Sequence, residues 1–261
     1  MISRFIGNPD DQLFATYHPP DAERGRDRAV LLCYPAQQEY RHSHWAFRKL
    51  AMQLASQGFH AMRFDYSGTG DSAGDMPETG LERWTADIAT AAAELRELSG
   101  LRKIALVGFR IGASLAVHAT AKGLSIADLV LWEPVVEGRA YLSQLTEAQD
   151  RFVTALRYPQ DMSRSPDELL GFPLPPAVRA QIAAINLAAG PFGKPGRVLV
   201  LDAEQRADSE RLVKAMTAQG IAVFHERVDD TGMTSAYATQ AETLLAHKIL
   251  DAIVSFLATT A

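Results

Sequence analysis

Residues 104 to 113, Ile104-Ala105-Leu106-Val107-Gly108-Phe109-Arg110-Ile111-Gly112-Ala113, join an apolar run to a short motif with two glycines. The apolar part predicts a buried strand, and the alanine-rich stretch from Ile111 to Ala121 predicts a helix. Glycines at 108 and 112 allow strand and helix to cross closely, while the residue between them, Arg110, projects from a strained turn. The stretch therefore predicts a strand, a sharp turn and a helix, with one side chain presented at the turn.

The same alternation of apolar strands and amphipathic helices extends to both sides of this turn. It predicts a doubly wound, mostly parallel sheet covered by helices, an α/β fold. The expected strands are Ala29 to Tyr34, His60 to Phe64, Ile104 to Phe109, Ala127 to Trp132, Arg197 to Leu201 and Ala222 to Val228. The expected helices are His44 to Gln57, preceded by Ser43, then Leu81 to Leu98, Ile111 to Ala121, Ser209 to Gln219 and Ala236 to Leu257.

The alternation stops between residues 138 and 190, which points to an insertion. Helical pieces there are interrupted by five prolines, at positions 159, 166, 173, 175 and 176. We expect one domain, in which residues 1–138 and 191–261 form the two parts of the core and residues 139–190 form a helical cap over the site.

Composition limits the classes of partner. The formal net charge is −5, so no basic field attracts nucleic acid or an anionic membrane surface, and a small molecule is the expected partner. Cys33 is the single cysteine, and the sequence lacks an apolar leader or an 18-residue apolar run, which favours a cytoplasmic location. Neither a phosphate-binding loop nor closely spaced Cys and His ligands is found, so we expect no cofactor and no metal. The oligomeric state is left open.

A second motif connects the chain to a known family. Asp65-Tyr66-Ser67-Gly68-Thr69-Gly70-Asp71-Ser72 resembles the DxxGxGxS turn of α/β-hydrolases, and the turn at Arg110 resembles their nucleophile elbow. The resemblance spans essentially the whole chain. More narrowly, the chain resembles the serine aminopeptidase-like branch that includes exosortase A system-associated hydrolases, with a subgroup that has arginine at the elbow. The matching stretches are residues 38–40, 43–44, 63–66, 131–136 and 138–142.

The resemblance implies a nucleophile, an acid and a histidine in that chain order, and this sequence departs from the pattern twice. Arg110 stands where a serine is expected, and a guanidinium can neither attack nor accept a proton. Residues 229–233, where the histidine is expected, contain none; His225 falls within the last strand and His247 within the closing helix. Asp208 and Glu133 are the two candidates for the acid. Ordinary Ser-His-Asp hydrolysis is therefore not expected.

A cation at the start of the elbow helix lies at the positive end of the helix dipole and calls for a neighbouring anion. Glu133 and Glu39 are the nearest carboxylates by topology, and a ligand carboxylate, phosphate or enolate is the third possibility. Arg110, Glu133, Glu39 and His44 are the candidate catalytic residues. The candidate substrate-binding residues are Gln38, Ile111 and Tyr141.

Each candidate also has a purely structural interpretation. Arg110 and Glu133 could form a permanent ion pair that fills a dead site, His44 could be an ordinary helix-end histidine, and Tyr141 could be a cap contact. Three hypotheses follow. The chain acts without a covalent serine step on a small anionic or acyl-type substrate; or it binds a ligand or a partner protein without catalysis; or a displaced serine such as Ser114 is the nucleophile.

Overall fold

A computed structural model describes residues 1–155, 167–229 and 246–259. The strands of these residues are β1 (Ile2–Ile6), β2 (Leu13–His18), β3 (Ala29–Cys33), β4 (His60–Phe64), β5 (Ile104–Phe109), β6 (Asp128–Trp132), β7 (Glu168–Leu169), β8 (Phe172–Pro173), β9 (Arg197–Asp202) and β10 (Ala222–Arg227). The helices are α1 (Gln37–Ser56), α2 (Leu81–Ser99), α3 (Ile111–Ala121), α4 (Gly138–Ala155), α5 (Pro176–Ala183), α6 (Ala207–Ala218) and α7 (His247–Ala258), with short 3₁₀ turns at Met76–Glu78 and Leu187–Ala189.

Among the described residues, eight strands form one sheet in the order β1-β2-β4-β3-β5-β6-β9-β10. The pairs from β4 through β10 are parallel, whereas β2 runs antiparallel to both β1 and β4. This confirms the predicted α/β-hydrolase fold with a mostly parallel sheet. Sequence analysis missed β1 and β2. Strand β1 lies at the sheet edge with its first four residues exposed, so it lacks the continuous apolar run of a buried strand.

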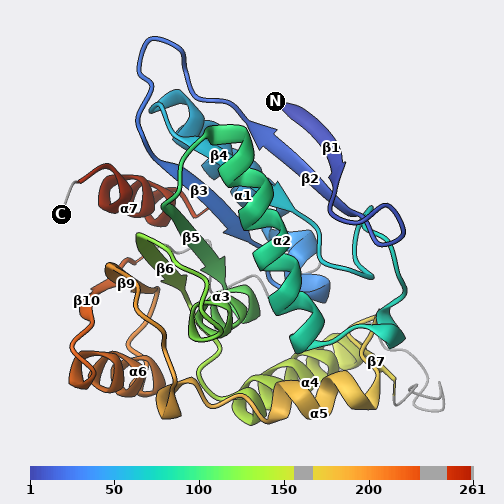
Figure 1. The fold of residues 1–261 in the computed structure, drawn as a ribbon. Helices are drawn as coiled ribbons and strands as arrows, with labels where there is room; N and C mark the ends of the chain where they lie inside the picture. Colours follow the sequence, from blue (N-terminus) through green and yellow to red (C-terminus); the bar gives the residue numbers. More distant parts are fainter. Residues whose placement is uncertain (156–166, 230–245, 260–261) are drawn as a thin grey trace.

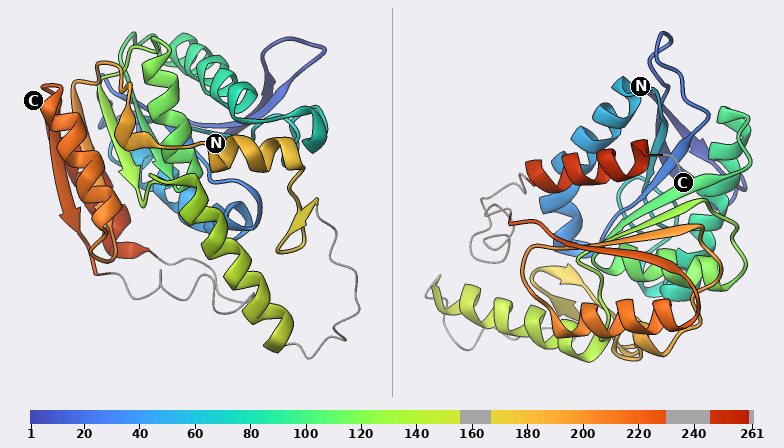
Figure 2. Two further views of the ribbon diagram at one scale, coloured as in Figure 1. Left: turned by 90° about the horizontal axis from the view of Figure 1, so that it is seen from below. Right: turned by 90° about the vertical axis from the view of Figure 1, so that its left-hand side faces the viewer.

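Helices cover both faces of the sheet. In Figure 2, α1 and α7 lie on one face, and α2, α3 and α6 lie on the other. The central strands β3, β5 and β6 are buried along their full length, as parallel strands covered on both sides must be. Large side chains that are fully buried, such as Trp84, Trp132 and Phe47, pack between these layers. The resulting rigid core fixes the loops that follow each parallel strand.

Two glycines of the central motif allow the close crossing that the sequence predicted. A Cβ atom on Gly112 would lie 2.2 Å from the carbonyl oxygen of Tyr34, and one on Gly108 would lie 2.5 Å from the Cα atom of Ala113. Both contacts involve backbone atoms that cannot move aside. Helix α3 can therefore begin directly against the carboxyl end of β3, which brings the first turns of α1 and α3 together.

The segment expected as a cap contains α4, β7, β8 and α5. Figure 1 shows α4 and α5 side by side beyond the edge of the sheet toward which β5 points. Two of the five interrupting prolines, Pro159 and Pro166, lie outside the described residues. The division into core and cap stays a prediction.

The helices begin within two residues of the expected positions, apart from α1 and the closing helix. Helix α1 begins at Gln37 rather than at His44, and Ser43 is an interior residue whose hydroxyl donates to the Glu39 carbonyl oxygen at 2.7 Å. A serine inside a helix can bond the preceding turn in this way, so it did not mark the helix start. The described part of the closing helix begins at His247, and residues 236–245 of the expected helix lie outside the described residues.

Candidate active site

The backbone is strained at three residues that follow adjacent strands. Gln37, Arg110 and Glu133 have φ angles of 60°, 53° and 46°, and they lie at the carboxyl ends of β3, β5 and β6. A non-glycine residue with positive φ costs about 1 to 3 kcal/mol, and such residues cluster at functional sites. The Arg110 amide donates to the Trp132 carbonyl oxygen at 3.0 Å, which ties the turn to β6. Three strained positions thus meet at one edge of the sheet.

The Arg110 guanidinium is buried and contacts side chains from three elements. Its Nε donates to Glu39 Oε1 of α1 at 2.9 Å, and its Nη1 lies 3.7 Å from Glu133 Oε2. Its Nη2 donates to Gln144 Oε1 of α4 at 3.3 Å. The predicted neighbouring anion is therefore present twice, and Glu39 is the closer of the two carboxylates.

Glu39 is held between the core and α4. Its second oxygen, Oε2, accepts a hydrogen bond from the Tyr141 hydroxyl at 2.7 Å, and the Arg110 guanidinium lies 5.2 Å from the centre of the Tyr141 ring. Glu39 also belongs to the first turn of α1, where the helix dipole stabilises an anion. The side chain is only 5% exposed, so its negative charge depends on these partners.

Glu133 is held less tightly than Glu39. Its Oε1 accepts the Ala203 amide at 2.9 Å, while its Oε2 faces Arg110 Nη1 at 3.7 Å and Arg206 Nη1 at 3.9 Å. Both distances exceed the range of about 2.7 to 3.2 Å for a hydrogen bond. With 16% of its side chain exposed, Glu133 is the more accessible of the two carboxylates.

Sequence analysis missed two residues of this cluster, Gln144 and Arg206. Gln144 lies three positions after Tyr141 on α4, so the two share one helical face. This spacing could have identified Gln144 from the sequence. Arg206 precedes α6, and its Nη2 donates to Asp208 at 2.7 Å while its Nη1 lies 3.8 Å from Asp202 Oδ1. Nη1 of Arg206 is buried and has no hydrogen-bond partner among residues 1–155, 167–229 and 246–259.

The ring contacts described for His44 are with aromatic side chains rather than with the Arg110 cluster. Its ring stacks on Tyr34 at 6.1 Å and lies 5.9 Å from the Tyr40 ring. Burial, followed by the nearby charge of Arg63, lowers the pKa of His44. The structure thus brings together Arg110, Glu39, Glu133 and Tyr141, and it places His44 in an aromatic environment on α1.

The candidate substrate-binding residues Gln38 and Ile111 belong to the first turns of α1 and α3. Amides in the first turn of a helix have no carbonyl partner within that helix. Gln38 is half-buried and Ile111 is fully buried, so the backbone of Ile111, rather than its side chain, is the part that could meet a ligand.

Three other groups considered from the sequence have partners of their own. Ser114 is 1% exposed, and its hydroxyl donates to the Val135 carbonyl oxygen at 2.7 Å. His225 lies within β10, as expected, and its Nε2 is 2.8 Å from Asp202 Oδ2. Asp208 accepts from Arg206 and from the Ser209 amide.

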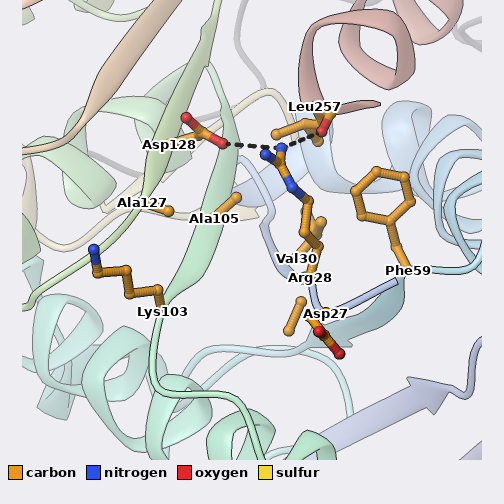
Figure 3. A pocket seen from close by; sticks show the side chains of 10 residues that line it. Asp27, Arg28, Val30, Phe59, Lys103, Ala105, Ala127, Asp128 and Leu257 are labelled. Atoms are coloured by element: carbon orange, nitrogen blue, oxygen red, sulfur yellow. Dashed lines mark hydrogen bonds and ion pairs between the residues drawn. The ribbon is translucent and has the colours of Figure 1, made fainter. Parts of the chain in front are cut away.

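A separate pocket of about 200 Å³ lies at the opposite edge of the sheet, near the amino ends of β3, β5 and β6 (Figure 3). Val30, Ala105 and Phe59 supply apolar surface, and Arg28 contacts Asp128 and the Leu257 carbonyl oxygen. In doubly wound sheets, ligands bind outside the carboxyl ends of the strands. The Arg110 cluster, not this pocket, therefore occupies the position of an active site.

Within residues 1–155, 167–229 and 246–259, no group of three or more His, Cys, Asp or Glu side chains could hold a metal ion. Over the same residues, no helix is both long and apolar enough to cross a membrane.

Comparison with known families gives a match across the elbow and the start of the expected cap. The model of the family "Serine aminopeptidase, S33" matches residues 40–172, which is just over half of the chain. The chain belongs to the serine aminopeptidase S33 family. The family match therefore includes Arg110, Glu133, Tyr141 and Gln144, whereas Glu39 and Arg206 lie outside the matched residues.

Relatives of this S33 family member support the fold. Human protein ABHD12B is 33% identical over 90 residues, which is 33% of this chain and 24% of that protein, so the match spans about a quarter of its length. A putative hydrolase from Agrobacterium vitis S4 is 18% identical with a TM-score of 0.61 and covers 98% of both chains. Est1E from Butyrivibrio proteoclasticus, solved with ferulic acid bound, is 16% identical with a TM-score of 0.62 over 97% of this chain and 96% of that one. DcsB, in complex with a substrate analogue, is 14% identical with a TM-score of 0.66 over 98% and 97%.

Proposed function

We propose that this S33 family member is a hydrolase-like enzyme that acts on a small acyl-type molecule without a covalent serine step. The supporting observation is that Arg110, at the strained elbow, lies between two carboxylates, one held firmly and one held loosely. Glu39 neutralises the guanidinium, and Glu133 is the accessible proton acceptor. The family and the fold favour acyl chemistry, while Arg110 itself cannot form an acyl intermediate.

The charges around Arg110 favour an acyl group over an anion. Among the described contacts, Arg110 and Arg206 face four carboxylates, those of Glu39, Glu133, Asp202 and Asp208. His225, which contacts Asp202, would offset one of the four when protonated. A ligand carboxylate would therefore have to displace one of the resident carboxylates, whereas an uncharged carbonyl would not.

The proposed step uses water as the nucleophile. Glu133 accepts a proton from the water as its oxygen bonds to the acyl carbon, and the bond to the leaving group breaks as that group takes the proton. First-turn amides of α1 and α3, at Gln38 and Ile111, are the donors available to the carbonyl oxygen as negative charge develops on it.

A second candidate function is ligand or partner binding without turnover. It is favoured by the 2.9 Å contact between Arg110 and Glu39, in which the guanidinium already has a buried counter-charge. A permanent pair of this kind is the structural interpretation of the elbow arginine, with Glu39 rather than Glu133 as the closer partner. The displaced-serine hypothesis loses support at Ser114, whose hydroxyl is buried and already donating.

Turnover of p-nitrophenyl esters from acetate to octanoate, with and without a fluorophosphonate inhibitor, tests the proposal. We expect slow hydrolysis that the inhibitor leaves unchanged and that Glu133→Gln abolishes. Glu94→Gln, on α2 and paired with Arg4, is the matched control and should keep full turnover. Labelling of a single serine together with complete inhibition would contradict the proposal. Absence of turnover with every ester would favour the binding role.

A further inference from the structure

The pocket at the amino ends of β3, β5 and β6, here called the amino-edge pocket, has an apolar interior and a charged mouth. Val30, Ala105 and Phe59 line the interior and are buried. Lys103 and Asp27 also line the pocket but are exposed, so they lie where it opens to solvent. A ligand that matches this lining has an apolar body and one polar end.

The volume of the amino-edge pocket limits the size of that apolar body. The pocket encloses about 200 Å³. A cavity of about 150 Å³ lined by apolar side chains binds benzene, whereas drug-sized ligands occupy clefts of about 300 to 1,000 Å³. The pocket is therefore large enough for one six-membered ring with a small substituent, or for a short aliphatic chain.

The buried charges in the wall of the pocket already have partners. Arg28 Nη1 donates to the carbonyl oxygens of Leu257 at 2.5 Å and of Thr259 at 3.1 Å. Asp128 accepts a hydrogen bond from Arg197 Nε at 2.8 Å and lies 3.6 Å from Arg28 Nη1. A ligand need not supply a counter-charge to this wall, so its polar end should lie at the mouth.

Lys103 is the cation at the mouth, and it forms no ion pair within residues 1–155, 167–229 and 246–259. Figure 3 places Lys103 at the left of the pocket and Asp27 at the lower right, so a group that contacts Lys103 stays away from the Asp27 carboxylate.

Charge around the amino-edge pocket also favours an anion. Some described charged side chains line the pocket, and others form an ion pair or ring contact with its lining. Cations outnumber carboxylates among them: Arg26, Arg28, Lys103 and Arg197 against Asp27 and Asp128. The local field therefore attracts an anion, although the whole chain carries a net charge of −5.

We infer that the amino-edge pocket binds a small apolar monocarboxylate, with its hydrocarbon body against Val30, Ala105 and Ala127 and its carboxylate at Lys103. This site is separate from the Arg110 cluster and does not rest on the proposed function, because the pocket lies at the opposite edge of the sheet. A neutral molecule of the same shape would fill the interior but would form no ion pair with Lys103.

Titration calorimetry with benzoate and its neutral analogue benzamide, at pH 7 and low ionic strength, tests the inference. Wild-type protein is expected to bind benzoate at least threefold more tightly than benzamide, within the range for one exposed ion pair. Lys103→Gln should weaken benzoate binding alone and make the two affinities equal. Lys214→Gln, at an exposed position on α6 that does not line the pocket, is the matched control and should keep the preference for benzoate.

A second variant tests the interior of the pocket. Ala105→Leu places additional carbon atoms where the ring is expected to lie, so it should weaken both probes at least tenfold. Alanine methyl signals of ¹³C-labelled wild-type protein cover the case in which this variant does not fold. The signals of Ala105 and Ala127 should shift on addition of benzoate, whereas that of Ala113, at the start of α3, should not.

Several results would overturn the inference. They are equal affinity of wild type for the two probes, no measurable binding of either probe, and an undiminished preference for benzoate in Lys103→Gln. Ala105→Leu protein that binds like wild type, or a methyl shift at Ala113 without one at Ala105, would do the same. None of these measurements requires turnover, so their outcome is independent of the proposed hydrolysis.

Discussion

Arg110 Nε lies 2.9 Å from Glu39 Oε1, and both side chains are about 95% buried, being 6% and 5% exposed. Two charges buried this far from water stabilise each other only while both are present. Removing one partner leaves an uncompensated charge, which typically costs about 3 to 5 kcal/mol. The stability of the fold therefore depends on this ion pair, which also belongs to the candidate active site.

Arg110→Gln is expected to lower the free energy of unfolding by about 3 to 5 kcal/mol, because Glu39 then keeps a buried charge with Tyr141 as its remaining named donor. Adding Glu39→Gln to the same protein should recover at least half of the loss. Urea unfolding followed by circular dichroism measures both. The exposed pair Lys122 and Glu82 is the control, and breaking it should cost no more than about 1 kcal/mol. A double variant as unstable as Arg110→Gln would show that the pair is not the cause.

Tyr141→Phe removes the hydroxyl that donates to Glu39 but keeps the ring beside Arg110. We expect a loss of about 1.5 to 3 kcal/mol, the usual range for a hydrogen bond to a charged group. Tyr141→Leu should cost a further amount of about 0.5 to 2 kcal/mol, because the guanidinium loses its aromatic partner. Thr146→Ala, on the exposed side of the same helix, should stay within about 0.5 kcal/mol of wild type in the same unfolding assay. If Tyr141→Phe and wild type had identical stability, the hydrogen bond from Tyr141 to Glu39 would contribute nothing to the free energy of unfolding.

Gly112→Ala should disrupt the elbow although it adds one methyl group. Its Cβ atom would lie 2.2 Å from the Tyr34 carbonyl oxygen and 2.4 Å from that of Cys33. Because both are backbone atoms at the carboxyl end of β3, we expect a loss of about 3 kcal/mol or more. Gly25→Ala is the control, since a Cβ there meets nothing within 4 Å, and its melting temperature should stay within a few degrees of wild type. A Gly112→Ala protein with the melting temperature of wild type would mean that α3 does not pack as closely as described.

Stability should fall as pH drops from 7 to 5. Burial, followed by the nearby charge of Arg63, lowers the pKa of His18 to about 4, and His18 Nε2 accepts from Arg63 Nε at 3.3 Å. Between the unfolded value of 6.5 and the folded value of about 4, the unfolded chain binds the extra proton, so acid favours unfolding. One histidine can change the unfolding free energy by at most about 1.4 kcal/mol per pH unit.

Urea unfolding at pH 7, 6 and 5 checks the prediction. His18→Gln should make the unfolding free energy depend less on pH, because its amide oxygen can still accept a hydrogen bond from Arg63 but does not titrate. An unchanged slope in His18→Gln would assign the pH dependence to other groups, such as His44, His60 and His118, whose pKa values burial also lowers.

Much of the fold followed from local pattern. Strands β4 and β5 and helix α3 have the bounds that the apolar runs and glycines predicted, since buried parallel strands leave a continuous apolar signature. Strand β1 could not be found in the same way, because an edge strand with exposed side chains has no such signature. The start of α1 was placed seven residues late, because the strained Gln37 gives no sequence signal for a helix start.

The sequence by itself determined that an arginine stands at the elbow. It also predicted that a glutamate from the end of a neighbouring strand balances the positive charge of that arginine. Only the tertiary structure decided which glutamate is closest. Glu39 and Arg110 are 71 positions apart, and their contact depends on α1 and α3 starting against each other across β3 and β5. Gln144 and Arg206 reach the cluster from α4 and from the loop before α6, and their long, flexible side chains can take many directions. Local pattern placed most of the strands and helices along the chain, but which charged ends meet depends on how distant elements pack.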